Sequence, residues 1–256
     1  MIANYHTHTS RCHHARGTEE EYAKAAFDGG LKILGFSDHT PWFSGNCQPG
    51  IRMRPEQLGE YCDAVRSLQK EYAGKMQIHL GLEVENYSQF LPELVSRARD
   101  QGVEYFLLAQ HWLLDSQADA PYCGSLTEDK TLLRRYCEQV IKAVNTGLFS
   151  YVAHPDLIRF SGDRQIYRQQ VRRLCREANS CGIPLEINLL GLREGRHYPN
   201  RLFWQVAGEE NCCCVIGCDA HSPETVYDPA TYAEAVRMAK EYGLSPMEMV
   251  ELRPIG

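Results

Sequence analysis

The chain has 256 residues, of which 43% are hydrophobic and 23% charged, and its 27 Lys and Arg against 33 Asp and Glu give a formal charge of −6. This composition is typical of a globular protein and argues against a disordered, collagen-like or coiled-coil chain. The acidic balance provides no general attraction to nucleic acid or to an anionic membrane, and no apolar run is long enough to span a bilayer. The sequence also starts without the basic and apolar regions of a secretion signal, so we expect a cytoplasmic protein.

Strand-like and helix-like segments alternate along the whole sequence. We predict strands over residues 2–8, 32–39, 77–85, 105–113, 151–156, 185–189 and 213–221. The helices predicted between and after them cover residues 18–29, 55–72, 91–101, 129–146, 165–181, 200–210 and 229–242. Some helices carry end signals, such as Thr18 with Glu21 at capping-box spacing and Gly102 as a stop. Seven strand–helix repeats with short connections indicate an α/β protein with a parallel sheet, either open or closed into a barrel.

The position of the polar residues favours the barrel. They fall at the carboxyl end of nearly every predicted strand, including the first and the last. Side chains from the first and last strands converge easily in a closed ring, whereas the edge strands of an open sheet lie far apart. We therefore predict one domain over residues 1–256, built as a seven-stranded barrel with its functional site at the carboxyl ends of the strands.

The eleven cysteines are scattered through a chain too long to need disulfide staples. Three of them, Cys212, Cys213 and Cys214, are consecutive, and consecutive residues of a strand alternate between its two faces. We interpret the cysteines as reduced thiols, mostly small core residues. The alternative is a cysteine-based metal site around Cys212, Cys214 and Cys218.

A group of histidines and carboxylates carries the strongest chemical signal. His6 and His8 are two residues apart, so both imidazoles leave the same face of an extended strand, and Asp219 and His221 repeat this spacing. Imidazole and carboxylate are ligands that Zn, Mn and Fe share. Nine candidates exceed the needs of one ion and suit two or three. The candidate ligands are His6, His8, His14, His39, Glu83, His111, His154, Asp219 and His221.

These motifs resemble those of the PHP (polymerase and histidinol phosphatase) superfamily. The resemblance runs from His6 to about Glu224 and rests on motifs that are specific as a set. They are His6-Thr7-His8 with Cys12 and His14, Phe36-Ser37-Asp38-His39, Gly81-Leu82-Glu83, His111, His154 and Gly217-Cys218-Asp219-Ala220-His221. The segments at 154–157, 188–193, 198–199 and 220–224 are similar to the histidinol-phosphatase branch in particular. The resemblance implies a distorted (β/α)7 barrel with a trinuclear metal centre.

The resemblance also implies how the ligands are shared. His6, His8, Glu83 and Asp219 would hold one ion, Glu83, His111 and His154 a second with Glu83 bridging, and His14, His39 and His221 a third. The doubled His13-His14 leaves the choice between them open, and His14 preserves the Cys-x-His spacing. Glu85 shares a strand face with Glu83, and we interpret it as a residue at the rim of the site. His79, early on its strand, is interpreted as structural.

Such a centre suits hydrolysis of a phosphomonoester by a hydroxide held between metal ions. Asp38 and Asp156 are candidates for assisting the leaving group, or for orienting His39 and His154, and for Asp38 we favour the orienting role. Arg159 and Arg193 follow predicted strands and are candidates to bind the phosphate, with Arg196 and His197 as weaker ones. The aromatic residues expected either to wall the substrate or to belong to the core are Trp42, Phe43 and Trp112.

The leading functional hypothesis is a cytoplasmic hydrolase of L-histidinol phosphate in histidine biosynthesis, with a small-molecule substrate and no nucleic-acid or membrane partner. One alternative keeps the metal centre but acts on nucleotides, oligonucleotides or phosphotyrosine. A second is metal-dependent hydrolysis of C–N bonds, which normally uses a carboxylated lysine that the middle strands here do not provide. A third is a metal-binding module without catalysis. Oligomeric state and the identity of the metal stay open.

Overall fold

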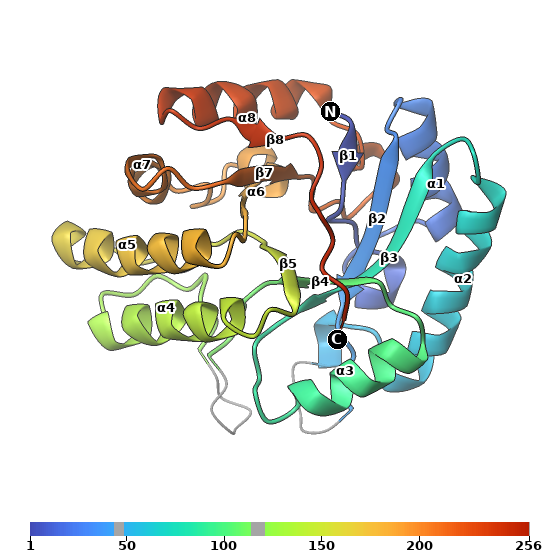
Figure 1. Cartoon of the computed structure of the whole chain (residues 1–256), viewed down its shortest axis with the longest axis horizontal. Coiled ribbons are helices and arrows are strands. Elements are labelled where there is room, and N and C mark those ends of the chain that lie inside the picture. Colours follow the sequence, from blue (N-terminus) through green and yellow to red (C-terminus); the bar gives the residue numbers. More distant parts are fainter. Residues whose placement is uncertain (44–48, 114–120, 256) are drawn as a thin grey trace.

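The computed structural model describes residues 1–43, 49–113 and 121–255. Its centre is one parallel sheet in which every strand pairs with its neighbours in sequence, in the order β1 to β8. Short strands β1 and β8 border the longer strands between them (Figure 1). The strands are β1 (Ala3–Asn4), β2 (Ile33–His39), β3 (Gln77–Val84), β4 (Tyr105–Leu108), β5 (Phe149–Val152), β6 (Leu185–Asn188), β7 (Cys214–Gly217) and β8 (Pro246–Met247).

Helices follow most strands and surround the sheet (Figure 1). They are α1 (Glu19–Asp28), α2 (Leu58–Glu71), α3 (Leu91–Asp100), α4 (Lys130–Val144), α5 (Arg164–Ser180), α6 (Leu189–Arg193), α7 (Arg201–Glu209) and α8 (Pro229–Glu241). Short 3-10 helices lie at η1 (Ser10–Cys12), η2 (Pro49–Ile51), η3 (Pro55–Gln57) and η4 (Pro223–Thr225). The predicted capping box of α1 is present, because Thr18 and Glu21 exchange side chain-to-backbone hydrogen bonds.

The sheet curls into a half-barrel, and its first and seventh strands meet at the carboxyl end. Thr7, beyond β1, forms a parallel bridge with Ala220, beyond β7. The two backbone hydrogen bonds of this bridge run from His8 N to Ala220 O at 2.9 Å and from Ala220 N to His6 O at 3.1 Å. This contact brings the extensions of β1 and β7 together, which is the convergence expected from the sequence.

The α/β barrel predicted from the sequence is confirmed, with one strand more than expected. Strand β8 pairs with the amino-terminal half of β7, Cys214 opposite Pro246 and Val215 opposite Met247. Two residues of proline and methionine carry no strand periodicity, so this strand leaves no recognisable pattern in the sequence.

The core has two parts on opposite faces of the strands. The larger part lies between sheet and helices, and the smaller lies inside the barrel around Tyr5, Tyr105 and Tyr151. The hydroxyl of Tyr105 donates to the carbonyl of Tyr5 at 2.8 Å. Its ring occupies space that a Cβ at Gly81 would fill, since that atom would lie 2.3 Å from the ring. Gly81 in β3 therefore leaves space for the buried ring of Tyr105.

Among helices of the described ranges, none combines the length and the apolar character needed to cross a membrane. The cysteines of these ranges are free thiols, most of them buried, which agrees with their interpretation as core residues.

Candidate metal centre

The structure brings all nine candidate ligands to the carboxyl end of the barrel. His39 and Glu83 end or nearly end their strands, and the others lie in the segments that leave β1, β4, β5 and β7 or follow η1. Because parallel strands all point their carboxyl ends to the same edge, residues far apart in sequence share one site. Eight of the nine are buried or half-buried, and His14 lies exposed at the rim.

Glu83 lies at the centre of the group and contacts five imidazoles from four segments of the chain. Its Oε1 lies 3.1 Å from His6 Nε2, 3.1 Å from His154 Nε2 and 3.7 Å from His111 Nε2. Its Oε2 lies 2.8 Å from His39 Nδ1 and 3.6 Å from His8 Nε2. A carboxylate placed in this way has the geometry to bridge two cations.

Asp219 and the remaining histidines extend the group outward. Asp219 Oδ1 lies 3.1 Å from His8 Nε2 and 3.5 Å from His6 Nε2. His221 Nε2 lies 3.0 Å from His14 Nε2, and the two share a cluster with His39. Among the described residues the structure places His14 in this cluster, whereas His13 belongs to none of them.

The protonation of these groups suits cation binding. Burial would raise the pKa of Glu83, but the surrounding imidazoles, His39 foremost, hold it well below its usual value. Burial lowers the pKa of His39 to about 3 and that of His221 to about 3, so both are neutral near pH 7. Burial alone would lower the pKa of His6, yet the nearby carboxylates, Glu186 foremost, raise it well above its usual value. The ionised carboxylates therefore concentrate negative charge at this site, and this charge attracts cations.

Unsatisfied polar atoms test whether the residues fit a metal. Nε2 of both His6 and His8, Nδ1 of His39 and Oε2 of Glu83 are buried and make no hydrogen bond of acceptable geometry, although they approach one another closely. Buried polar atoms normally have partners, and leaving several unpaired at one point is costly. Nitrogen and oxygen donors of this kind match Zn, Mn and Fe, so the residues present fit metal ions.

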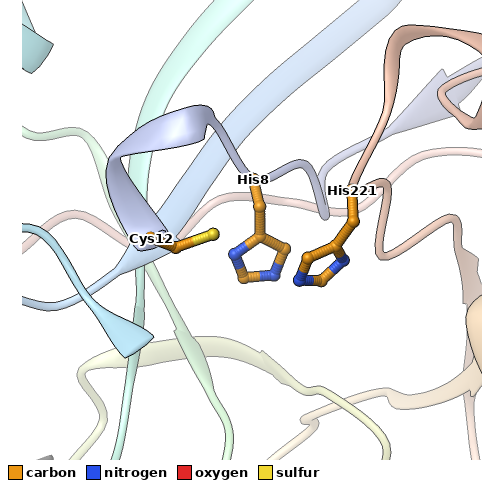
Figure 2. Close-up of side chains that lie close together, drawn as sticks. All are labelled: His8, Cys12 and His221. Atoms are coloured by element: carbon orange, nitrogen blue, oxygen red, sulfur yellow. The ribbon is translucent and has the colours of Figure 1, made fainter. Parts of the chain in front are cut away.

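Cys12 lies beside the same group. Figure 2 shows its sulfur next to the imidazole of His8, whose other side faces His221. Ligand atoms of these three residues lie within 4.8 Å of one another. Burial raises the pKa of the Cys12 thiol, so without a metal it is a neutral core thiol. The alternative site at Cys212, Cys214 and Cys218 does not appear among the ligand clusters of the described residues.

Two of the ligands have strained backbones. His154 has a φ of 27° and Asp219 a φ of 48°, in the left-handed region that non-glycine residues rarely adopt. Both follow the last residue of a strand by two positions, so the strain occurs where the chain turns its side chain over the barrel mouth. Such strain at a point of convergence is typical of functional sites.

Glu186 of β6 is a functional residue that the sequence interpretation missed. It is fully buried, and its Oε1 lies 2.8 Å from His6 Nδ1. Its Oε2 accepts hydrogen bonds from His154 N at 2.9 Å and from Asn188 Nδ2 at 2.9 Å. It thus orients His6 with Nε2 toward Glu83. The only sequence signal is an acidic residue inside an apolar strand, Leu185-Glu186-Ile187.

Glu85 was expected at the rim, and this expectation is wrong. Its side chain is only 1% exposed, and its Oε1 lies 3.2 Å from His111 Nδ1. A strand residue two positions beyond Glu83 stays on the same interior face, and the chain beyond β3 covers it. His79 lies away from the group and pairs with Glu104, as expected for a structural residue.

Asp38 and Asp156 do not line the cavity next to the ligands. Asp38 is buried, with Oδ1 accepting from His39 N at 2.7 Å and lying 3.5 Å from His8 Nδ1, while Oδ2 accepts from Thr9 N at 3.2 Å. It therefore contacts the backbone of His39 and the ring of His8. Asp156 Oδ2 accepts hydrogen bonds from Asn200 N and, at 3.1 Å, from Trp204 Nε1. It anchors the start of α7 and makes no hydrogen bond to His154.

A cavity of about 340 Å³ opens above the ligands. Trp112, Tyr122 and Tyr198 line it together with Glu194 and Arg196. Nη1 of Arg196 donates to the hydroxyl of Tyr198 at 2.8 Å, and its Nε donates to Glu194 at 2.8 Å. The cavity therefore offers one guanidinium and several aromatic faces beside the metal ligands.

The other expected substrate residues lie outside the cavity lining. Arg193 points to α8, with Nη1 3.4 Å from Asp228 Oδ2, because α6 carries it away from the barrel mouth. Arg159 is exposed, and His197 Nε2 lies 2.7 Å from the carbonyl of Leu157. Of the expected aromatic residues, Trp112 lines the cavity and Trp42 and Phe43 do not.

Comparison with known proteins adds independent information. The chain matches the PHP domain over residues 4–189. It is 31% identical over 253 residues to a probable histidinol-phosphatase of Deinococcus radiodurans, covering 94% of each chain. It is 25% identical to the histidinol-phosphatase of Bacillus subtilis, covering 84% of this chain and 92% of that one.

Solved structures share the fold. A histidinol phosphate phosphatase of Lactococcus lactis, in complex with Zn, L-histidinol and phosphate, superimposes with a TM-score of 0.74 at 17% identity, covering 99% of this chain and 97% of that one. The structure named as the putative histidinol phosphatase hisK of Listeria monocytogenes superimposes with a TM-score of 0.71 at 19% identity, covering 88% of this chain and 97% of that one. Taken with the metal-binding clusters at the barrel mouth, the family match and the 31% identical relative establish that the chain belongs to the PHP family and is a phosphatase, a hydrolase that binds metal ions.

Proposed function

We propose that this phosphatase hydrolyses L-histidinol phosphate to L-histidinol and phosphate, as a cytoplasmic step of histidine biosynthesis. The observation that carries the proposal is the cavity of about 340 Å³, where aromatic walls and one arginine face the ligand group. This volume lies within the usual range of small-molecule sites. The similarity to histidinol-phosphatases over nearly the whole chain supports this choice of substrate.

We further propose a trinuclear centre. His6, His8 and Asp219 form one ligand cluster, His6, Glu83 and His154 a second, and His14, His39 and His221 a third. His111, 3.7 Å from Glu83, completes the second. Bound ions would compensate the charge of the phosphoryl oxygens and lower the pKa of coordinated water.

The chain's own residues bind and orient the substrate. Arg196 is placed to donate to phosphoryl oxygens, a role that the sequence assigned to Arg193 and Arg159. Tyr198, whose hydroxyl accepts from Arg196, fixes the guanidinium beside the ligands. Trp112 and Tyr122 form a wall that suits the flat imidazole of histidinol phosphate. Glu186 and Asp38 hold the rings of His6 and His8 in place.

A substrate panel with defined metals tests the proposal. Purified protein is stripped with a chelator, reloaded with Zn, Mn or Fe, and assayed for phosphate release from histidinol phosphate, AMP and phosphotyrosine. We expect turnover that depends on added metal and is fastest on histidinol phosphate. Equal rates on all three would refute the substrate, and no release with any metal would refute catalysis. Element analysis that finds one ion per chain would refute the trinuclear centre.

A further inference from the structure

A buried ion pair lies behind the His111 side of the centre. Arg52, in the segment between β2 and α2, is 2% exposed. Its Nη2 donates to Glu85 Oε1 at 2.8 Å and its Nη1 to Glu85 Oε2 at 3.2 Å. Nη1 also donates to the carbonyl of Thr40 at 3.1 Å. This two-pronged contact holds the plane of the Glu85 carboxylate.

The same carboxylate contacts a metal ligand. His111 Nδ1 lies 3.2 Å from Glu85 Oε1, and its Nε2 lies 3.7 Å from Glu83 Oε1. An ionised carboxylate only accepts hydrogen bonds, so Nδ1 carries the proton and Nε2 presents its lone pair toward Glu83. A carboxylate that holds the second nitrogen is a common way to fix the ring of a metal-binding imidazole.

We propose that Arg52 is a positioning residue of the metal centre, which acts through Glu85 to hold the His111 ring with Nε2 facing the bridging Glu83. The inference rests on the proposed metal centre and adds to it a residue that touches neither metal nor substrate. A carboxylate without its guanidinium would be an unpaired buried charge near Glu83, and it would lose its fixed plane.

The position of Arg52 also connects metal binding to the shape of the cavity. Its neighbour Ile51 lines the cavity, and the ion pair with Glu85 anchors the short segment that carries both residues. Loosening this segment therefore affects both His111 and the cavity wall. We expect substitution of Arg52 to weaken metal binding and, in addition, to raise KM.

The test measures metal affinity of the full chain directly. Arg52→Lys keeps the positive charge but cannot form both hydrogen bonds to the Glu85 carboxylate. Arg54→Met is the matched control, because Arg54 is exposed and lies in the same segment. Apo protein is titrated with Zn²⁺ and Mn²⁺ against a chromophoric chelator. We expect roughly ten- to hundred-fold weaker binding at one site for Arg52→Lys, and unchanged binding for Arg54→Met. Unchanged binding by folded Arg52→Lys would overturn the inference.

A double variant tests whether the effect passes through Glu85. Glu85→Gln retains an amide oxygen that accepts from His111, and Arg52→Met with Glu85→Gln leaves no lone buried charge, which protects folding. We expect Arg52→Met to weaken binding little in the Glu85→Gln background, because the carboxylate it positions is already gone. If Arg52→Met reduced metal affinity equally in the Glu85 and the Glu85→Gln backgrounds, Arg52 would not act through Glu85. Failure of the unmutated chain to bind metal would instead overturn the proposed centre itself.

Discussion

Gly217→Ala is a one-methyl change that tests how the metal centre is supported. Gly217 lies in β7 opposite Asn188 of β6. A Cβ at this position would lie 1.9 Å from Glu186 Oε1 and 2.8 Å from its Cδ. Ordinary contact begins at 3.4 Å, so the carboxylate oxygen must move by at least 1.5 Å, the difference between 3.4 and 1.9 Å.

Glu186 has no free space to move. It is fully buried, and its Oε1 lies 2.8 Å from His6 Nδ1 while its Oε2 accepts from His154 N. A displacement of 1.5 Å breaks at least one of these contacts. Overpacking and a lost charge-assisted hydrogen bond together cost about 3 kcal/mol of unfolding free energy. Because His6 loses its orienting carboxylate, we expect metal affinity to fall roughly ten- to hundred-fold.

The assay combines thermal unfolding, chelator competition for metal, and phosphate release. Gly59→Ala is the matched control, since its Cβ would meet nothing within 4 Å. It should leave metal binding and phosphate release unchanged, and it should raise the unfolding temperature slightly because Gly59 lies in helix α2. Glu186→Gln removes the charge without crowding and should weaken metal binding in the same direction. The reasoning is refuted if folded Gly217→Ala binds metal as tightly as the unmutated chain. It also fails if Gly217→Ala loses metal while Glu186→Gln does not.

Three further predictions concern the substrate, acid stability and metal removal. Arg196→Ala should raise KM for the phosphomonoester without loss of the bound metals, because Arg196 lines the cavity. Arg193→Ala should change KM little, because Arg193 pairs with Asp228. Steady-state kinetics of the two variants test this difference. Burial by itself would raise the pKa of Glu104, but the hydrogen bond and charge of His79, with the hydrogen bonds from Gln69 and the Leu80 backbone, together lower it below its usual value. The stabilisation from these contacts is present above the ordinary carboxyl pKa and is lost as pH falls, so Glu104→Gln should flatten the acid unfolding curve. Chelation should lower the unfolding temperature, and adding metal should restore it in proportion to the logarithm of its concentration.

Local patterns predicted the strands β1 to β7, although several predicted strands extend past the observed ends: residues 105–113 were expected, and β4 covers Tyr105–Leu108. The strands can be recognised because they are apolar runs between polar segments, and the spacing of His6 with His8 predicts that their side chains share one face of an extended segment. The barrel follows from the alternation of strands and helices, and it is confirmed. Strand β8 was not predicted, because two residues are too few to show a strand periodicity. It is defined by its pairing with β7.

Only the tertiary structure determines the contacts between segments that are far apart in the sequence. Glu186 meets His6 across 180 positions, and Gly217 is required there only because Glu186 occupies the space of its Cβ. Glu85 is buried against Arg52, which the sequence keeps 33 positions away, and does not lie at the rim. The path of the segments after β6, rather than proximity in sequence, directs Arg193 to Asp228 and Arg196 to the cavity. The sequence determined which groups gather at the barrel mouth, because strand direction is a local property. Their partners depend on twist and loop path, which no local pattern specifies.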